Sequence, residues 1–392
     1  MEYIEWAFWI LLFVIFYAYL GYGIVLVLLL KIKNLFSKPG AADSEPFEPE
    51  VTLFVAAYNE AAYIEDKIKN TLDIDYPRDK LRIVFVTDGS DDGTPEILRK
   101  HEGIHVYHQA SRAGKIGAIN RGMGFVISPI VIFSDANAML NKQVVREMVK
   151  HYRNPAVGCV AGEKRILKRE FDTASGAGEG IYWRYESALK KMDSNLNSAI
   201  GAAGELFSIR TELFEPVEKD TLLDDFIISM RIAARGHKIV YEPGAYASES
   251  ASASIKDEMK RKVRICAGGL QSIVRLKALL NPFRFGLLSF QYISHRVLRW
   301  TLVPLFLLLV IPLNYLLMLD KQGIYILLFY GQVLFYSAAL IGWFLENRSL
   351  RIKLVFVPFY FSIMNIAAFK GFFRYIKGSQ SVLWERANRA SV

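Results

Sequence analysis

A long apolar stretch near the start of the chain constrains the fold more than any other feature. Trp6 to Leu30 comprises 25 residues without a charged side chain, and about 20 apolar residues suffice to cross a bilayer. The stretch is too long for the apolar part of a secretory signal, and no cationic segment precedes it. It is also longer than most helices buried in a soluble core. The sequence therefore predicts an N-terminal transmembrane helix within residues 1–38.

The charges that flank this stretch predict its orientation. Glu2 and Glu5 precede it, whereas Lys31, Lys33 and Lys38 follow it. Basic residues beside membrane segments concentrate on the cytoplasmic side. We therefore expect the N-terminus outside and the following chain in the cytoplasm, in a plasma membrane or a bacterial inner membrane.

Apolar segments return in residues 301–392. Thr301–Leu319 and Gly323–Leu345 are uncharged and long enough to span, which predicts a transmembrane hairpin with both ends in the cytoplasm. Leu354–Phe369 has only 16 residues and contains Pro358. If this third segment crossed, the basic tail would lie outside, against the usual charge distribution. The sequence favours a re-entrant or interfacial segment with a cytoplasmic tail, and a full crossing is the alternative.

Residues 281–300 are predicted to lie in the headgroup plane. Their large apolar residues recur every three or four positions and their basic residues lie off that stripe, as in an amphipathic interfacial helix. A core-facing helix is the alternative. Contact with a membrane also explains the net charge of +9, so nucleic acid is not expected as a partner.

Between the membrane segments we expect a linker at residues 39–50 and a cytoplasmic α/β domain at 51–280. Short apolar runs alternate there with helix-compatible stretches. These runs are Val51–Ala57, Leu81–Thr87, Ile104–His108 and Ile130–Ser134. Such runs predict buried parallel strands of a doubly wound sheet, which binds ligands at the carboxyl ends of its strands. The sequence has no dinucleotide fingerprint, P-loop or nucleophile elbow.

Acidic and small polar residues gather where these runs end. Asp88 closes the second run, and Asp135 and Asn137 follow the fourth. Hard oxygen ligands of this kind suit Mg²⁺ or Mn²⁺ bound to a diphosphate. A turn-forming role for Asp88 and a helix cap for Asp135 are the alternatives. The turn from Arg112 to Lys115 is suited either to phosphate or simply to solvent.

Two adjacent acids begin a further predicted helix. Asp224 and Asp225 open an amphipathic stretch that runs to Ala234 and ends at Gly236. Acids at a helix start commonly cap it. Repulsion between neighbouring carboxylates also raises the pKa of one of them, which suits it as a general base for a hydroxyl nucleophile. Both interpretations stay open on the residues alone.

In their order along the chain, these motifs resemble those of membrane-bound family 2 glycosyltransferases. These are inverting enzymes with a GT-A fold, which include cellulose, chitin, hyaluronan and poly-N-acetylglucosamine synthases. The resemblance runs from about Val51 to Gly269 and extends into the C-terminal hairpin. The matching motifs are Ala57-Tyr58-Asn59-Glu60, Asp88-Gly89-Ser90 with Asp92-Gly93-Thr94, Arg112-Ala113-Gly114-Lys115, Asp135-Ala136-Asn137, Gly201-Ala202-Ala203-Gly204 and Asp224-Asp225. Each is weak alone, whereas six in order are specific.

The resemblance implies a UDP-sugar as donor and a role for each motif. Asp225, with Asp224 beside it, is implied to be the general base, and Asp135 with Asn137 to hold Mg²⁺ or Mn²⁺. The implied nucleotide-sugar site comprises Ala57, Tyr58, Glu60, Asp88, Lys115, Asp135, Asn137 and Arg264. The implied acceptor site comprises Gly204, Glu205, Arg261 and Ile265.

Two departures from the family pattern bear on mechanism. Asn137 replaces the second acid of Asp-x-Asp, which implies weaker metal binding. Processive members carry Gln-x-x-Arg-Trp where this chain, aligned on Gly268, has Arg264 but then Ile265. Ile265 offers no ring to stack on the terminal sugar of a growing polymer.

The sequence therefore favours transfer of a sugar to a glycan or lipid-linked acceptor in surface polysaccharide synthesis. The alternative is a processive synthase that also exports its polymer. One N-terminal and two or three C-terminal crossings would form only a thin channel, so export would then call for a homo-oligomer or an accessory subunit. A catalytically silent scaffold is a third hypothesis, which the retained Asp225, Lys115 and Arg264 disfavour.

Overall fold

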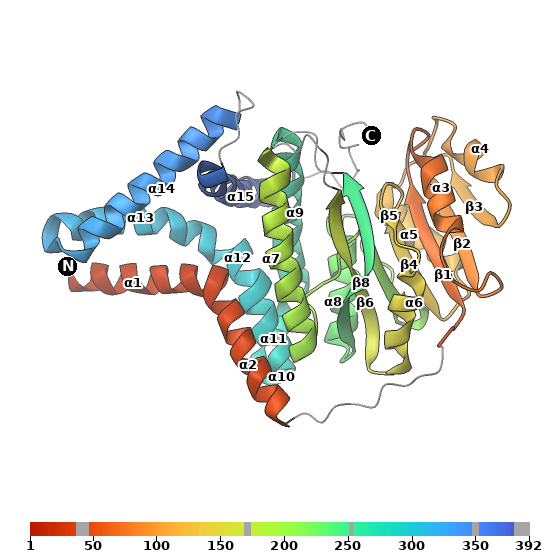
Figure 1. Ribbon diagram of the computed structural model, residues 1–392, viewed down its shortest axis with the longest axis horizontal. Helices are drawn as coiled ribbons and strands as arrows, with labels where there is room; N and C mark the ends of the chain where they lie inside the picture. Colours follow the sequence, from red (N-terminus) through yellow and green to blue (C-terminus); the bar gives the residue numbers. More distant parts are fainter. Residues whose placement is uncertain (37–46, 168–173, 251–254, 347–352, 380–392) are drawn as a thin grey trace.

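The chain folds into an α/β domain on one side and apolar helices on the other, as the computed structural model shows (Figure 1). The structure describes residues 1–36, 47–167, 174–250, 255–346 and 353–379. Most of the predicted linker, and the tail from residue 380 on, lie outside the described residues. Two long helices, α7 (Ala174–Leu196) and α9 (Ile255–Arg275), stand between the two parts.

One mixed sheet forms the centre of the α/β domain. Its strands are β1 (Val51–Ala57), β2 (Leu81–Asp88), β3 (Ile104–Gln109), β4 (Ile130–Asp135), β5 (Met139–Leu140), β6 (Val157–Leu167), β7 (Leu206–Arg210) and β8 (Lys238–Ser250), in the order β3-β2-β1-β4-β7-β6-β8-β5. The four predicted runs form β1 to β4, which are mutually parallel. The parallel strands predicted for these four runs are confirmed, and the rest of the sheet is mixed, since β7 pairs antiparallel with both β4 and β6.

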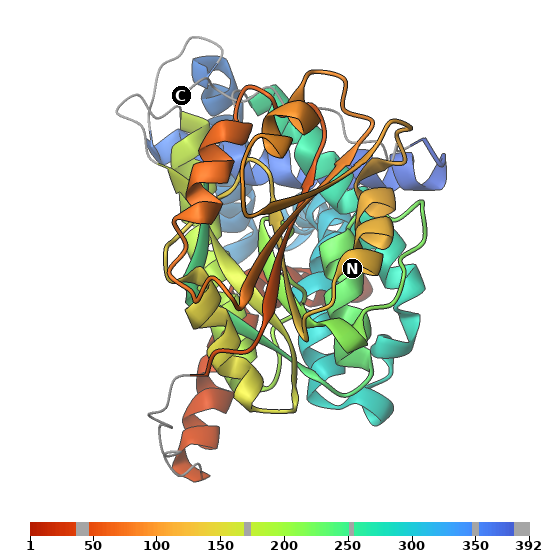
Figure 2. The same cartoon turned by 90° about the vertical axis from the view of Figure 1, so that its right-hand side faces the viewer.

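Both faces of this sheet are buried. Along β1, Phe54 and Ala56 enter one core while Leu53 and Val55 enter the other, as alternation along a strand requires. Burial on both faces explains why the sequence shows continuous apolar runs there. The covering helices include α3 (Ile64–Leu72), α4 (Thr94–Arg99), α5 (Gly114–Gly122), α6 (Val144–Val149) and α8 (Asp224–Ala234). Figure 2 views the sheet from the side of β1 to β3.

The N-terminal apolar stretch forms a bent helix rather than one straight span. Helix α1 (Glu2–Phe16) continues through a π-helical turn at Tyr17–Gly21 into α2 (Tyr22–Phe36), and such turns commonly kink a helix. Helix α1 packs beside α13, whereas α2 turns away toward the domain (Figure 1). Tyr22 and Leu26 are buried there against α7.

Three further apolar helices follow: α13 (Leu302–Lys321), α14 (Ile324–Glu346) and α15 (Lys353–Ile376). With the N-terminal one, four helices of the described chain are long and apolar enough to cross a membrane, and many of their large apolar side chains are exposed. The protein is therefore a membrane protein. Helix α15 is longer than the predicted third segment. Helix α15 runs along the line of sight in Figure 1 and across the view in Figure 2. Helix α1 runs across the view in Figure 1 and along the line of sight in Figure 2, so the two helices cross at a steep angle.

The predicted interfacial helix is broken at Gly286, whose φ is 51°. It comprises α10 (Pro282–Phe285), α11 (Leu287–Tyr292), a π-helical turn (Ile293–Val297) and α12 (Leu298–Trp300). Its polar side faces the protein rather than water. His295 is fully buried between Asp193 (2.5 Å) and Glu186 (3.2 Å) of α7, and Glu186 also pairs with Arg296 at 2.6 Å. This buried ion network fixes the interfacial segment to the α/β domain.

Candidate active site

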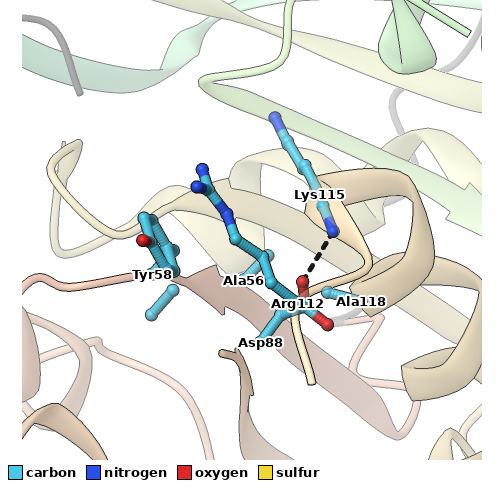
Figure 3. A pocket seen from close by; sticks show the side chains of 8 residues that line it. Ala56, Tyr58, Asp88, Arg112, Lys115 and Ala118 are labelled. Atoms are coloured by element: carbon cyan, nitrogen blue, oxygen red, sulfur yellow. Dashed lines mark hydrogen bonds between the residues drawn. The ribbon is translucent and has the colours of Figure 1, made fainter. Parts of the chain in front are cut away.

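A pocket opens at the carboxyl ends of β1 and β2 (Figure 3). It is lined by Ala56, Ala57, Tyr58, Asp88, Arg112, Gly114, Lys115 and Ala118. The guanidinium of Arg112 lies over the ring of Tyr58, 3.8 Å from its centroid. The pocket thus offers a flat ring, a cation and a carboxylate at the edge where such sheets bind ligands.

Hydrogen bonds join the loops that follow β1 and β2. The backbone N–H of Asn59 donates to Ser90 Oγ at 3.1 Å, and that of Glu60 donates to Thr94 Oγ1 at 3.0 Å. The Asn59 side chain donates to Asp91 at 2.8 Å. These residues hold the rim of the pocket in place. The side chain of Glu60, predicted to bind nucleotide, does not line the pocket.

Asp88 both holds the start of α5 and lines the pocket. Its Oδ2 accepts from the backbone N–H groups of Ala113 (2.8 Å) and Gly114 (2.6 Å), and Arg121 lies 3.3 Å from Oδ1. It therefore caps the N-terminus of α5, where a negative charge is favourable because the helix dipole is positive at that end. Because Asp88 also lines the pocket, a ligand bound there would contact a carboxylate that already accepts hydrogen bonds from α5.

Lys115 joins the two acidic motifs. Its ammonium lies 2.8 Å from Asp135 Oδ1 and 3.6 Å from Asp224 Oδ2. Its side chain extends away from Asp88 (Figure 3). Burial lowers the pKa of Lys115, but the carboxylates of Asp135, Asp224 and Asp225 more than reverse this, so the net direction is upward. Lys115 is therefore a permanent positive charge between the end of β4 and the start of α8.

Asp225 has the electrostatic character of a general base. Burial, and next the negative charge of Asp224, raise the pKa of Asp225 from 3.8 to about 7, against the opposing effect of Lys115. A Cβ added at Gly204 would lie 3.2 Å from the Lys115 Nζ and 3.5 Å from the Asp225 Oδ2. Glycine at 204 thus leaves the space beside Asp225 and Lys115 free of a side chain.

The predicted acceptor residues are only partly brought together. Glu205 follows Gly204 and bonds to Lys164, whose ammonium also lies 2.8 Å from Glu249. Burial raises the pKa of Glu205, but Lys164 and then the positive charge of Arg261 more than reverse this, so the net direction is downward. Arg264, predicted to bind nucleotide, instead donates to the Leu222 carbonyl at 3.4 Å, beside the loop that leads to Asp224. Neither Arg264 nor Ile265 lines the pocket beside Tyr58 and Asp88.

The side-chain oxygens at the end of β4, on Asp135 and Asn137, are of the kind that binds a divalent cation. No described residue donates a hydrogen bond to Asp135 Oδ2, and Asn137 lies in the turn that follows β4. The described residues contain no group of three His, Cys, Asp or Glu arranged to hold a metal. Asp135 and Asn137 would thus supply two ligands, and substrate phosphates are the usual source of the others.

Lys67 is a buried residue of this region that sequence reasoning missed. It is fully buried on α3 and donates to Ser134 Oγ at 2.8 Å and to the Ala138 carbonyl. These two groups flank Asp135 and Asn137 in the chain. Lys67 therefore braces the turn that carries both predicted metal ligands. A lysine within a helical pattern gives no sign of this contact, which joins residues about 70 positions apart.

Replacing Lys67 by Met is expected to raise the KM for the nucleotide-sugar that the family resemblance implies about tenfold. The change leaves a buried carbonyl without its partner, which costs about 1–3 kcal/mol, and loosens the β4 turn. Initial rates at varied donor concentration measure the effect. Lys69→Met, an exposed lysine on the same helix, is the matched control. An unchanged KM in Lys67→Met would contradict the bracing role.

Comparisons with known proteins show a similarity to glycosyltransferases. Residues 52–216 match the family model described as glycosyl transferase family 2. The poly-beta-1,6-N-acetyl-D-glucosamine synthase of Staphylococcus aureus is 27% identical over 234 residues, which are 57% of this chain and 56% of that protein. The synthase of Staphylococcus epidermidis is 25% identical over the same shares. The chain thus spans little more than half the length of these curated relatives.

A solved structure resembles nearly the whole fold. It is a mannosyltransferase from Pyrobaculum calidifontis in complex with GDP-Man and Mn²⁺, with a TM-score of 0.70 and 22% identity. The match covers 96% of this chain and 100% of that one. The predicted GT-A fold with flanking membrane helices is thereby confirmed.

Proposed function

Because residues 52–216 belong to glycosyl transferase family 2, we propose that the chain is an inverting glycosyltransferase at the cytoplasmic membrane face. It transfers a sugar from a nucleotide-sugar to a glycan or lipid-linked acceptor in surface polysaccharide synthesis. One observation carries the proposal: Asp225, with a pKa raised to about 7, lies beside Lys115 at the open space left by Gly204. A base poised near neutral pH is what deprotonation of an acceptor hydroxyl requires.

In this mechanism the pocket beside Tyr58 and Asp88 holds the nucleotide, and the ammonium of Lys115 binds the diphosphate. Asp225 accepts the proton of the acceptor hydroxyl while the hydroxyl oxygen attacks the anomeric carbon. The bond to the diphosphate breaks on the opposite side, so the configuration inverts. Asp135 and Asn137 would hold a divalent cation, which when bound would supply positive charge for the leaving diphosphate.

The donor is proposed as a UDP-sugar on the family resemblance. The solved mannosyltransferase, which shares the fold, instead holds GDP-Man. A panel of UDP- and GDP-sugars with Mn²⁺, Mg²⁺ or EDTA decides between them, with nucleotide release from purified protein as the readout. Metal-dependent release from one donor would support the proposal and identify the sugar. No release from any donor, in the presence of membrane lipid, would refute it.

A processive synthase is a second candidate, since the curated relatives are named as polymer synthases. Ile265 in place of the stacking tryptophan argues against it. A homo-oligomer or an accessory subunit would then be required to complete an export path. Product size in the same assay separates the two: a ladder of long products favours the synthase, and single additions favour the first proposal.

We also propose that the N-terminus lies outside and the C-terminal tail in the cytoplasm. The orientation of α15 across α1 supports an interfacial placement (Figures 1 and 2). A fluorescent protein fused after Val392 is therefore expected to fluoresce in a bacterial host, and a periplasm-dependent phosphatase fused there to stay inactive. A phosphatase inserted at Gln322, in the predicted outer turn, should be active as the control. The reverse result at Val392 would show that α15 crosses.

A further inference from the structure

The interfacial segment (residues 282–300) contacts the helix that carries the proposed base. Phe226 follows Asp225 in the first turn of α8, and its side chain is buried. Two rings of the interfacial segment pack on the ring of Phe226. Trp300 lies edge-on to it, with 5.3 Å between the ring centroids, and Tyr292 lies at 6.3 Å. The interfacial segment is therefore in contact with the residue next to the base.

Close packing fixes the position of Phe226. Gly201 lies directly against its ring, because a Cβ at this glycine would clash with the Phe226 side chain. Trp300 in turn lies against α9, where a Cβ at Gly269 would come within 2.6 Å of the indole ring. Two close approaches to glycine thus leave both rings little room to move. Protein interiors are packed without spare volume, so loss of the indole ring would release Phe226.

One face of the interfacial segment makes these contacts. Tyr292, Arg296 and Trp300 recur every four residues, so they lie on the same side of the helical segment. The Nε of Arg296 donates to the carbonyl of Ile200 at 3.4 Å, directly before Gly201. This face therefore holds both the first turn of α8 and the loop that begins at Gly201.

The same segment is anchored to the N-terminal helix through other residues. The Nε of Arg299 donates to the carbonyl of Ala18 at 2.9 Å, and the hydroxyls of Tyr17 and Ser294 lie 2.7 Å apart. Tyr17 and Ala18 belong to the π-helical turn between α1 and α2, and such turns often occur at functional sites. The interfacial segment thus joins the bend of the N-terminal helix to the start of α8.

The first turn of α8 depends on packing for its position. Its N-cap residue is Leu223, which has no polar side chain to bond the free N–H groups there. Phe226 also acts on Asp225 directly. Burial, the largest effect, raises the pKa of Asp225, as does Asp224. Lys115 and then a hydrogen bond from the backbone N–H of Phe226 lower it. A displaced Phe226 would therefore change both the place and the surroundings of the carboxyl group.

We propose that Trp300 is a positioning residue for sugar transfer: its ring holds Phe226, and thereby the carboxyl group of Asp225, beside Gly204. The inference rests on the proposed function, in which Asp225 is the base. It gives the interfacial segment a role in catalysis, and the anchor at Ala18 supplies a fixed support on the membrane side.

Nucleotide release by the full-length protein in phosphatidylcholine nanodiscs tests the proposal, with the donor and metal that the panel of sugars identifies. Trp300→Leu keeps an apolar side chain but loses the ring, so kcat should fall about 10- to 100-fold, as misplacement of a catalytic group commonly causes. The KM for the donor should stay within about twofold, because neither Trp300 nor Phe226 lines the pocket. Trp300→Phe keeps an aromatic edge and should retain most of the rate. Trp343→Leu, at an exposed tryptophan of α14, is the matched control and should change neither constant.

A double-mutant cycle shows whether Trp300 acts through Phe226. Phe226→Leu should lower kcat by a similar factor, and adding Trp300→Leu to it should cost less than about twofold more, since the contact is already lost. Multiplication of the two single effects would overturn the proposal. So would a wild-type kcat in Trp300→Leu, an equal loss of UDP affinity in the folded variant, or no recovery in Trp300→Phe. Trp300→Met, which fills more volume, takes the place of Trp300→Leu if the latter does not fold.

The titration of Asp225 gives a readout that does not require transfer. A water-soluble carbodiimide modifies protonated carboxyl groups, so the pH dependence of Asp225 labelling, followed by mass spectrometry, reports its pKa. Because burial is the largest cause of the raised pKa, release of Phe226 should move the midpoint in Trp300→Leu downward by about one pH unit. The charged groups that act on Asp225 are unchanged in this variant, namely Asp224, Lys115, Glu205 and Lys190.

The two proposals can fail separately. A shifted labelling midpoint in Trp300→Leu, together with no nucleotide release by the wild type from any donor, would sustain the positioning role and refute the transferase. Nucleotide release by the wild type, with kcat and midpoint both unchanged in Trp300→Leu, would do the opposite.

Discussion

Replacing Asp225 by Asn is expected to lower the rate of sugar transfer about 10²–10⁴-fold, the usual contribution of a general base. Nucleotide binding should stay near that of the wild type, because Asp225 does not line the donor pocket. The amide keeps the shape of the side chain but accepts no proton. Transfer to an acceptor and equilibrium binding of the nucleotide, measured on the same preparation, give the two readouts.

The pH profile of the wild type provides an independent test of the same assignment. The pKa of Asp225 is raised to about 7, so below pH 7 its carboxyl is protonated and cannot act as a base. The rate should rise about tenfold per pH unit up to pH 7 and then level off. The rise in rate with pH below pH 7 should be absent from the residual activity of Asp225→Asn.

Asp73→Asn is the matched control, since Asp73 is 68% exposed and pairs only with Lys142 among the described residues. It should leave both the rate and the profile unchanged. Near-normal transfer by Asp225→Asn would remove Asp225 as the base, and the geometry would then direct attention to Asp224.

The first half of the fold was predictable because its signals are local. The runs that form β1 to β4 are buried on both faces, so each is apolar throughout and stands out from the helices between them. The acids at the ends of these runs meet at one edge for the same reason. The positions of Asp88 and Asp135 at this edge were therefore predictable without any knowledge of tertiary contacts.

The second half was not predictable because its strands carry charges. Strand β6 includes Glu163, Lys164 and Arg165, and β8 ends near Glu249, so neither has a strand-like apolar run along its whole length. The burial of Lys164 depends on Glu205 and Glu249, which come from elsewhere in the chain. Ion pairs of this kind are tertiary information.

The same limit explains the interfacial segment. Arg296 and His295 were expected on a polar face toward water, because charge usually marks solvent. Their partner Glu186 lies more than 100 residues earlier, within a helix whose own sequence gives no sign of the pairing. The burial of Lys67 was not predictable for the same reason.

Lys115→Met is expected to change both the height and the position of the pH profile. Loss of the cation that meets the diphosphate should lower the plateau rate about a hundredfold, as removal of one electrostatic donor commonly does. The acidic groups near it would also lose the charge that now lowers the pKa of Asp225. That pKa should therefore rise further, which moves the acid limb upward by about 1–3 pH units. Steady-state rates between pH 5 and 10 measure both effects.

Each effect in Lys115→Met tests a different contact. A lower plateau with an unchanged midpoint would show that Lys115 serves the diphosphate but does not set the pKa of the base. A shifted midpoint with a normal plateau would show the reverse. Lys142→Met, an exposed lysine paired with Asp73, controls for the loss of one positive charge and should do neither. Only the combined change supports Lys115 as the link between donor and base, since its ammonium is the one described cation in contact with both Asp135 and Asp224.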